Sequence, residues 1–398
     1  MMADANRKSI RMAVLTSHPI QYQAPLFRRL SQVPGLALRV FFCWDFGVRE
    51  GRDPQFGRAF KWDIPLLEGY DYEFLKNVSS DPGTHWYYGL KNIDAVERIL
   101  AYMPDVCWIN GYCHWTERQV LKHLKRRGVQ ILFRGESNFL VSPPLWKRMI
   151  KWFYLRWWFA NVDRFLCIGS LNREFYLHYG VSEEHLFLAP YAVDNDFFSG
   201  CSETAQIEAR RWRVDLGIAP DTTVVLFAAK LIPKKRPLDL LRAFAGCRHV
   251  KHAVLVFVGD GELRDDLIKE VERLRLTDRV YLLGFQNQSR MPTCYALGDI
   301  MVLPSMIEPW GLAVNEAMNL ARPIIVSTRV GAAPDLVAPG KAGWIFPAGD
   351  SEALTRCLDE ALEDRRRLVY MGIEARERIK QWGIDQTVEG ILNAVRSL

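Results

Sequence analysis

Two acidic residues, Glu308 and Glu316, stand eight positions apart around the expected start of a helix. The apolar run 300–303 before them is typical of a buried strand, and Pro309-Trp310-Gly311 turns the chain into a helix that stops before Pro323. We expect Glu308 to lie exposed in the loop. Helix starts attract anions through free N–H groups, whereas carboxylates accept hydrogen bonds from hydroxyls. The stretch therefore predicts a site for a ligand that carries both phosphate and sugar hydroxyls.

Taken alone, this spacing is weak evidence, because two solvated acids beside a helix start would have the same pattern. Three further loops in the second half add chemistry to it. Lys230 ends a strand and Lys235 opens a helix, so the two cations could hold a leaving diphosphate, with a solvated basic turn as the alternative. Gly259 belongs to a turn that lets the backbone approach a ligand, although a simple tight turn looks alike. Gly284 and Phe285 could offer backbone groups to a base.

Helices alternate with short apolar strands through both halves of the chain. This alternation predicts an α/β protein of two Rossmann-like domains, each a doubly wound parallel sheet, that face each other across a cleft. We place the domains at 1–197 and 198–379, with a last helix in 380–398 packing back on the first. Residues 45–90 show no clear period. The expected strands are 12–16, 38–42, 106–109, 130–133 and 165–168 in the first half, and 224–229, 254–258, 280–283, 300–303, 324–327 and 344–346 in the second.

The composition is that of an ordinary soluble protein. The chain has 398 residues, 49% of them hydrophobic, and a net charge of +6. No run approaches the roughly 20 apolar residues that cross a bilayer, and the first twelve residues lack the apolar stretch of a signal peptide. The eight cysteines are scattered and predict reduced thiols in a cytoplasmic protein. Without a nucleic-acid-binding motif, the modest positive charge does not indicate DNA or RNA as a partner.

Taken together, these loops resemble the retaining glycosyltransferases of family 4 (group 1), which have the GT-B fold. AAKLIPKKRPLDLLRAF resembles the family's donor-phosphate loop, VFVGDGEL its glycine turn, and EPWGLAVNEAM its signature of two glutamates. LAPYAVDNDFF resembles the segment between the two domains, with Tyr191-Ala192 where the family usually has Asn-Gly. The resemblance covers about residues 165–380 well and the rest of the chain loosely.

On the sugar side, the resemblance implies a role for each matching residue. Glu308 would contact hydroxyls of the donor sugar, with the backbone amides of Trp310 and Gly311 beside it. Glu316 would accept hydrogen bonds from the ribose hydroxyls. Gly259, Gly284 and Phe285 would line the nucleotide side of the same site.

On the phosphate side, the resemblance implies that Leu312 and Ala313 give their N–H groups to the diphosphate. Lys230 and Lys235 would stabilise the leaving phosphate. The first of these positions is more often arginine in the family. Lysine keeps the positive charge there but lacks the guanidinium that binds a phosphate through two hydrogen bonds.

The resemblance implies transfer of a sugar from a nucleotide-diphosphate sugar to a hydroxyl, with retention and with neither metal nor cofactor. The first domain would bind the acceptor and the second the donor. We expect a UDP-sugar, with a GDP-sugar as the alternative, and a glycan, lipid-linked or small-molecule acceptor in cell-surface polysaccharide or glycoconjugate biosynthesis. The alternatives are a non-transferring enzyme, epimerase-like or phosphorylase-like, and an inactive sugar-nucleotide-binding protein. The motif 194–196 imitates a metal-binding D-x-D, but we interpret it as structural.

The first domain departs from the family pattern at several candidate positions. Many members have a glycine pair where this chain has His18-Pro19, so His18 could donate to the diphosphate, or the loop could contact only the acceptor. Where many relatives have a histidine, Arg134 could bind an anionic acceptor or a donor phosphate, oriented by Glu136; a surface ion pair is the alternative. His114 is a candidate for binding the acceptor hydroxyl, with a structural histidine as the alternative.

A basic, aromatic segment suggests a location. Residues 118–156 contain ten lysines and arginines against one acid, Glu136, and the helix expected at 146–159 is rich in tryptophan. Helices that combine aromatic and basic residues can lie on anionic membranes, while a helix that is apolar nearly all round is usually buried. The sequence therefore predicts either a peripheral contact with the inner face of the membrane or a buried helix.

Overall fold

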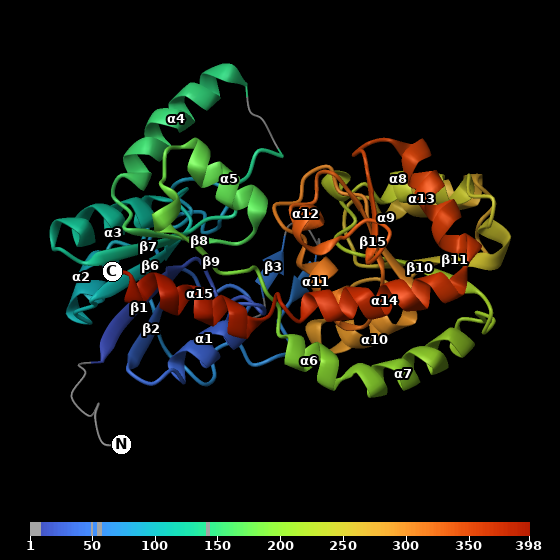
Figure 1. Cartoon of the computed structure of the whole chain (residues 1–398), viewed down its shortest axis with the longest axis horizontal. Coiled ribbons are helices and arrows are strands. Elements are labelled where there is room, and N and C mark those ends of the chain that lie inside the picture. The colour runs from blue at the N-terminus through green and yellow to red at the C-terminus, as the bar shows by residue number, and fades with distance from the viewer. Residues whose placement is uncertain (1–8, 49–50, 54–57, 141–143) are drawn as a thin grey trace. The chain divides into compact units, whose positions relative to one another are not determined.

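The computed structural model describes residues 9–48, 51–53, 58–140 and 144–398 (Figure 1). The chain forms two compact units, which we call the N-terminal unit (1–51, 64–191 and 384–398) and the C-terminal unit (52–63 and 192–383). The division thus falls at 191/192 where we expected 197, and a short early segment belongs with the C-terminal unit. Residues 1–8, on which the expectation about a signal peptide partly rests, lie outside the described residues.

The N-terminal unit is built on a seven-stranded sheet whose order is β5-β2-β1-β6-β7-β8-β9. Its pairs are parallel, and its central strands are apolar and buried on both faces, as a sheet covered by helices requires. The pairing of β5 and β9 at the two edges was not predicted, because β5 is mostly exposed and β9 has only three residues. The strands are β1 Ile10–Thr16, β2 Leu36–Phe42, β5 Asp71–Phe74, β6 Val106–Asn110, β7 Gln130–Arg134, β8 Arg164–Cys167 and β9 Leu186–Leu188.

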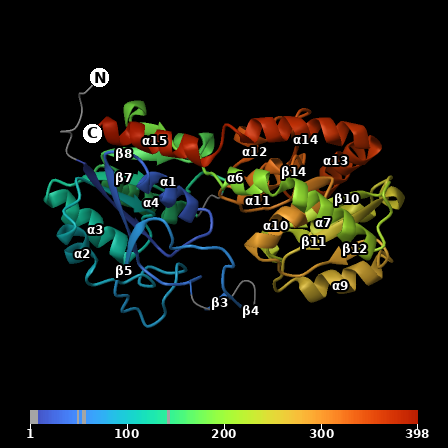
Figure 2. The same cartoon turned by 90° about the horizontal axis from the view of Figure 1, so that it is seen from below.

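Helices cover this sheet, and the last of them comes from the end of the chain. Helix α15 packs against α1, β8 and β9, where the Thr387 hydroxyl donates to the Pro190 carbonyl (Figure 2). A Cβ at Gly390 would lie 1.9 Å from the Leu188 carbonyl oxygen, so only glycine allows this close approach. The helices of the unit are α1 Ala24–Ser31, α2 Ala95–Ala101, α3 Trp115–Arg126, α4 Leu145–Phe159, α5 Ser170–His178 and α15 Ile384–Arg396.

The C-terminal unit is built on a six-stranded parallel sheet of order β12-β11-β10-β13-β14-β15. Numbered along this unit the order is 3-2-1-4-5-6, which reverses direction between β10 and β13; ligands of such sheets bind at that switch point. All six strands were predicted within one residue at each end. They are β10 Thr223–Ala228, β11 Ala253–Val258, β12 Val280–Leu282, β13 Ile300–Leu303, β14 Ile324–Ser327 and β15 Gly343–Phe346.

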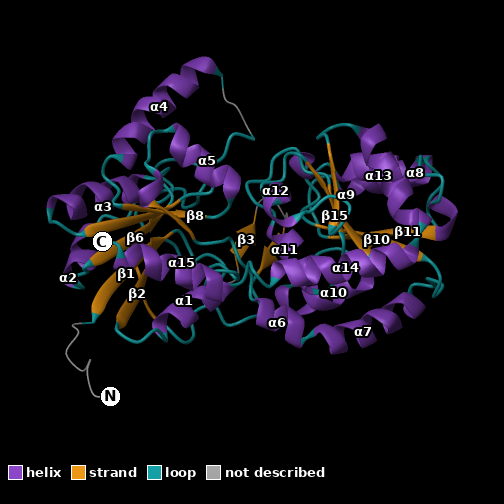
Figure 3. Ribbon diagram, viewed as in Figure 1, coloured by secondary structure: helices purple, strands orange, loops and turns teal. Residues whose placement is uncertain are grey.

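Nine helices of the described residues surround the second sheet (Figure 3). A cluster of buried apolar residues from β10, β11, α8 and α13 forms one of its cores. The short pair β3 (Gly51–Asp53) and β4 (Arg58–Phe60) forms a separate two-stranded sheet. The helices are α6 Asn195–Gly200, α7 Ser202–Asp215, α8 Pro237–Ala245, α9 Arg264–Arg273, α10 Met291–Leu297, α11 Leu312–Asn319, α12 Ala333–Leu336, α13 Ser351–Glu363 and α14 Arg365–Ile379. The predicted fold of two Rossmann-like domains is confirmed.

Candidate active site

Four loops follow the carboxyl ends of β12, β11, β10 and β13, which are adjacent in the C-terminal sheet. They contain the four stretches that the sequence analysis singled out. The loops after β10 and β13 lie on either side of the switch point, where the two outgoing helices diverge and leave room for a ligand. The backbone joins these two loops directly, because the Met306 amide donates to the Lys234 carbonyl at 2.8 Å.

The ammonium of Lys235 forms an ion pair with the carboxylate of Glu308 at this point. The two side chains are only 16% and 14% exposed, so the expectation of an exposed Glu308 was wrong. Burial, reinforced by the charges of Lys234 and Lys230, lowers the pKa of Lys235 to about 7, while the ion pair acts in the opposite direction. The sequence could not show this pairing, since 73 residues separate the partners.

The backbone around Glu308 is held by the loop that follows β14. The Glu308 amide donates to the Arg329 carbonyl at 3.2 Å, and the Gly331 amide donates to the Glu308 carbonyl at 3.0 Å. A Cβ at Gly331 would lie 1.9 Å from the Pro309 carbonyl oxygen, so the two loops approach as closely as glycine permits. The position of the Glu308 backbone therefore depends on the loop that follows β14.

Helix α11 begins beside Glu308 with its N-terminus formed by a left-handed residue, Gly311, at a φ of +104°. The indole of Trp310 donates to the Asn315 side-chain oxygen at 2.9 Å and stacks on Trp382, which fixes the entry to the helix. The amides of Leu312 and Ala313 fall in the first turn, where N–H groups have no partner within the helix. This arrangement can bind an anion.

Glu316, one turn further along α11, is oriented by two residues that the sequence analysis missed. The Tyr295 hydroxyl donates to one carboxylate oxygen at 2.6 Å, and the Gln288 amide donates to the other at 3.1 Å. Burial raises the pKa of Glu316, and the two hydrogen bonds offset part of that effect. No spacing rule links these positions, because η4 (Gln288–Arg290) and α10 contribute them from another part of the unit.

The glycine turn after β11 brings its backbone against the neighbouring loops. The Gly259 amide donates to the Gly284 carbonyl at 2.9 Å, which places the segment ending in Phe285 beside the turn. Gly259 has a φ of +138°, and a Cβ there would lie 2.0 Å from the Ala229 carbonyl oxygen. Only glycine can therefore connect these strand ends so closely, whatever ligand they bind.

Comparison with known proteins identifies the family of this site. The family described as glycosyl transferases group 1 matches residues 208–379. The D-inositol 3-phosphate glycosyltransferase of Rhodococcus jostii is 30% identical over 371 residues, which cover 84% of this chain and 77% of that protein. This chain belongs to the group 1 glycosyltransferases.

Other members of the family match over a shorter length. The N-acetyl-alpha-D-glucosaminyl L-malate synthase of Bacillus anthracis is 31% identical over 165 residues, which span only 42% of either protein. Among solved structures, HepE of Anabaena in complex with UDP superposes with a TM-score of 0.73 over 98% of this chain and all of that one. At 18% identity, this last similarity concerns the fold.

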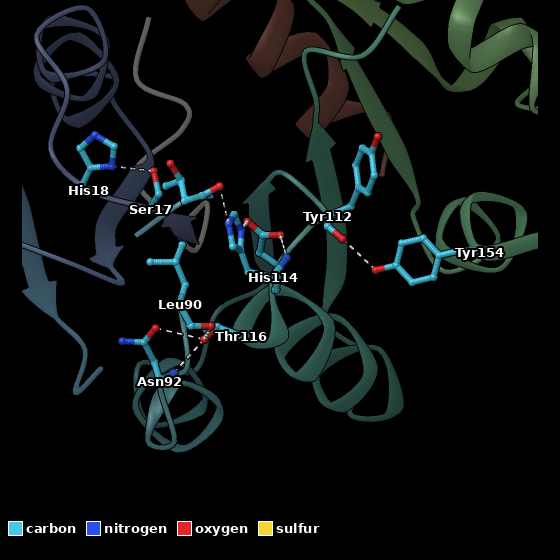
Figure 4. A network of polar contacts seen from close by, with 10 residues as sticks. Ser17, His18, Leu90, Asn92, Tyr112, His114, Thr116 and Tyr154 are labelled. Atoms are coloured by element: carbon cyan, nitrogen blue, oxygen red, sulfur yellow. Dashed lines mark hydrogen bonds and ion pairs between the residues drawn. The ribbon is translucent and has the colours of Figure 1, made fainter. Parts of the chain in front are cut away.

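In the N-terminal unit of this glycosyltransferase, the candidates follow the carboxyl ends of strands of the other sheet, and two of them, His18 and His114, are labelled in Figure 4. His18 follows β1, and its Nδ1 lies 3.0 Å from the Ser17 hydroxyl. The edges of its ring also contact Trp44 and Phe46. His18 is thus held by Ser17 of its own loop and by two aromatic residues that follow β2, and it is only partly exposed.

His114 caps the start of α3 and is buried with Glu117. Its Nδ1 lies 3.0 Å from a Glu117 carboxylate oxygen, its backbone amide donates to the other oxygen at 2.9 Å, and its Nε2 lies 3.4 Å from the Thr84 carbonyl (Figure 4). Burial alone lowers the pKa of His114, but the hydrogen bond and charge of Glu117 outweigh it and raise the pKa. This geometry favours the structural interpretation, and a role for His114 toward the acceptor stays a prediction.

Arg134 ends β7 and is only 5% exposed, which rules out the surface ion pair that we considered. Its guanidinium lies 4.7 Å from the ring centre of Tyr191 and 5.9 Å from that of Trp108. Glu136 is exposed and accepts a hydrogen bond from the Tyr191 hydroxyl. Tyr191 therefore connects the two charged groups.

The D-x-D-like motif is part of the scaffold. The Asp194 carboxylate accepts a hydrogen bond from the Phe197 amide and caps α6, while the Asn195 side chain bonds to Asn319 and to the Ile379 carbonyl. Among the residues that the structure describes, no three His, Cys, Asp or Glu side chains are grouped so that they could hold a metal ion.

Proposed function

We propose that this glycosyltransferase moves a sugar from a nucleotide-diphosphate sugar to a hydroxyl acceptor with retention of configuration. The observation that carries the proposal is the ion pair of Lys235 and Glu308, held next to the N-terminus of α11 at the switch point of the C-terminal sheet. A cation and free amides suit a diphosphate, and a carboxylate beside them suits the hydroxyls of the attached sugar.

In the proposed reaction, Lys230, Lys235 and the amides of Leu312 and Ala313 bind the diphosphate and stabilise the charge that develops as its bond to the sugar breaks. Glu308 orients the sugar, and Glu316, held by Tyr295, accepts hydrogen bonds from the ribose. The acceptor hydroxyl attacks the anomeric carbon from the leaving-group side. Its proton passes to the departing phosphate oxygen, so the enzyme needs no nucleophile of its own.

We further propose UDP as the nucleotide. HepE of Anabaena, which shares the fold, has been solved with UDP and with UDP-glucose. The glycine turn and Gly284 offer the base mainly backbone groups, so no side chain fixes its identity, and a GDP-sugar is the alternative. The acceptor would be a glycan, a lipid-linked sugar or a small molecule; two relatives are named for inositol 3-phosphate and L-malate.

Thermal unfolding with UDP, GDP, ADP and CDP in turn tests the donor site. A nucleotide at about 100 times its Kd should stabilise the folded state by roughly 2.7 kcal/mol, a rise in Tm of a few degrees for a chain of this size. NMR of the anomeric proton in the transfer product then tests retention. A product with inverted configuration would contradict the mechanism, and equal shifts for all four nucleotides would contradict selective donor binding.

Two other activities use the same donor site. A phosphorylase-like or epimerase-like enzyme would turn over the nucleotide sugar without an added acceptor, whereas the proposed transferase releases nucleotide in proportion to the acceptor glycosylated. An inactive binding protein would show the thermal shift without turnover. Measuring released UDP and the identity of the remaining nucleotide sugar, with and without acceptor, separates the three.

We also propose that α4 places the enzyme on the inner face of an anionic membrane. The first half of α4 extends away from the rest of its unit (Figure 1), and its apolar side chains are exposed, including Met149 at 65% and Phe153 at 70%. Lys147 and Arg148 are exposed on the same half, and α4 contains no acid. The buried residues of α4 are Leu155, Trp158 and Phe159, all in its second half, so the alternative of a buried helix was wrong. No helix among the described residues is long and apolar enough to cross a membrane.

Liposome pelleting tests this contact. Wild-type protein should pellet with vesicles that contain anionic lipid, and Met149→Ser with Phe153→Ser should reduce binding at least tenfold, because both lose buried apolar area. Lys147→Glu with Arg148→Glu should do the same only for anionic vesicles. The matched control is Arg126→Glu, which changes charge on the neighbouring helix α3. Equal pelleting of all variants would contradict the proposal.

A further inference from the structure

We infer that the carboxyl edge of the N-terminal sheet contains a subsite for a carboxylate or phosphate group, formed by Arg134 and Asn110, and that this group belongs to the acceptor. Only the naming of the ligand as the acceptor rests on the proposed function; anion binding at the subsite does not depend on it.

The first observation is the state of the Arg134 guanidinium. Arginine stays charged in proteins, and a buried charge is costly unless it is paired. Among the residues that the structure describes, no carboxylate forms an ion pair with Arg134 and no acceptor is hydrogen-bonded to it. The rings of Tyr191 and Trp108 lie against the guanidinium, and such contacts compensate only part of the cost of burial. The donor fork of Arg134 is therefore available to an anion.

The second observation concerns the neighbouring strand. Asn110 is the last residue of β6 and is paired in register with Arg134, so the two side chains leave the same face of the sheet. The Asn110 side-chain nitrogen is buried and has no hydrogen-bond partner among the described residues. A second unsatisfied donor thus lies beside the first, and two unsatisfied donors favour a ligand with acceptor oxygens.

Nearby groups allow the site to select an anion. Glu136 is exposed and bonded to the Tyr191 hydroxyl, so its charge compensates Arg134 only from a distance. An arginine fork binds carboxylate and phosphate oxygens in pairs, which a neutral hydroxyl cannot reproduce. We assign the anion to the acceptor because the C-terminal unit already provides two lysines and a helix N-terminus for the donor diphosphate.

Calorimetric titration of the full chain tests the inference, with UDP present at saturation so that the donor site is filled. The probes are inorganic phosphate and malate, with glycerol as a neutral control and sodium chloride to equalise ionic strength. We expect phosphate or malate to bind, and Arg134→Met to weaken that binding at least tenfold. Phosphate alone would identify a phosphoryl group as the recognised anion, and malate alone a carboxylate.

Three further variants make the test specific. Asn110→Leu should weaken anion binding roughly tenfold. Arg134→Lys should retain part of the binding, because lysine keeps the charge but lacks the forked guanidinium. Arg173→Met is the matched control: this arginine of the same unit is paired with Glu183 at the surface and should not affect the probes. Arg134→Met should melt at the same temperature as wild type or higher, because it removes an unpaired buried charge.

Several results would overturn the inference. If neither anion binds wild type more tightly than chloride does, or if Arg134→Met leaves binding unchanged, no such subsite exists. If Arg134→Met melts lower and no variant alters anion binding, the role of Arg134 is structural. If Arg134→Met weakens the binding of UDP, the anionic group bound by Arg134 belongs to the donor and not to the acceptor. Should UDP not bind at all, the same titrations without it still test the anion subsite, which separates its failure from that of the donor site.

Discussion

The two sheets of this glycosyltransferase have the same strand order around their switch points but differ in how their carboxyl edges are built. In the C-terminal unit Gly259 and Gly331 bring loops together, Lys235 is paired with Glu308, and Glu316 accepts a hydrogen bond from Tyr295. In the N-terminal unit the corresponding edge carries the side chains of His18, Asn110 and Arg134. Two of these three have donors that no other described residue satisfies.

The C-terminal edge follows the family pattern, whereas the N-terminal edge departs from it. A nucleotide diphosphate is common to many transferases, and a site made of backbone and paired charges can bind it with little variation. The acceptor differs from one enzyme to another, and an edge made of individual side chains can change with it. We therefore expect substitutions in the two edges to have different effects.

The largest effect should come from Glu308→Ala and Lys235→Ala. If these residues stabilise the transition state, each should reduce kcat/KM for transfer about 100- to 1,000-fold, measured at a temperature at which the variant is folded. The control is Lys234→Ala, which removes an exposed cation from the same turn and should reduce kcat/KM less than threefold. Full activity in either of the first two variants would show that the donor edge is not catalytic.

A smaller effect should follow from Gly331→Ala, which alters the donor edge without changing a charge. Its Cβ would meet the Pro309 carbonyl at 1.9 Å, so the loop that holds Glu308 must shift. We expect affinity for the nucleotide sugar to fall roughly tenfold and stability by about 1–3 kcal/mol, measured by calorimetry and thermal unfolding. Gly200→Ala is the control, since a Cβ there contacts nothing and should be neutral. Equal behaviour of the two variants would mean that the close approach is unimportant.

The smallest effect on catalysis should come from His114→Ala on the other edge, because we expect that residue to stabilise the fold. The variant leaves the buried Glu117 without its partner and should lose about 1–3 kcal/mol of stability, with kcat changed less than twofold. The folded pKa of His114 is raised, so the charged part of its contribution is complete below about pH 6.5 and is lost as the pH rises through the folded pKa.

The loss of stability in His114→Ala should therefore be larger at pH 6 than at pH 9, measured by denaturant unfolding. His85→Ala removes an exposed pair with Asp81 and serves as the control, with an expected effect within a few tenths of a kcal/mol. A large fall in kcat would instead assign His114 to the acceptor.

The sequence predicted the buried strands well, because a strand covered on both faces must be apolar along its whole length. It did not predict β5, whose residues Asp71–Phe74 are half polar and lie at an edge, where only one side of the strand is paired. Short or exposed strands show little hydrophobic periodicity, so their formation depends on backbone pairing with a neighbouring strand.

The sequence predicted those parts of the site that lie within a single motif, but not the contacts between motifs. The loops of Lys235 and Glu308 were recognised separately, but their ion pair joins residues far apart in the chain, and so does the contact of Tyr295 with Glu316. Burial was also misjudged: polar residues in loops look exposed in a sequence, yet Glu308 and Arg134 are largely covered. Which polar residues a fold buries depends on the loops that pack over them.

The return of α15 has a consequence for how the protein is made. The N-terminal unit needs residues 384–398 to cover β8 and β9, so its last helix leaves the ribosome only after the whole C-terminal unit has been synthesised. Until then β8 and β9 lack the helix that covers them, whereas all the residues of the C-terminal unit are already available. The N-terminal unit is thus started first and completed last. Removal of residues 384–398 would destabilise this unit more than the C-terminal unit.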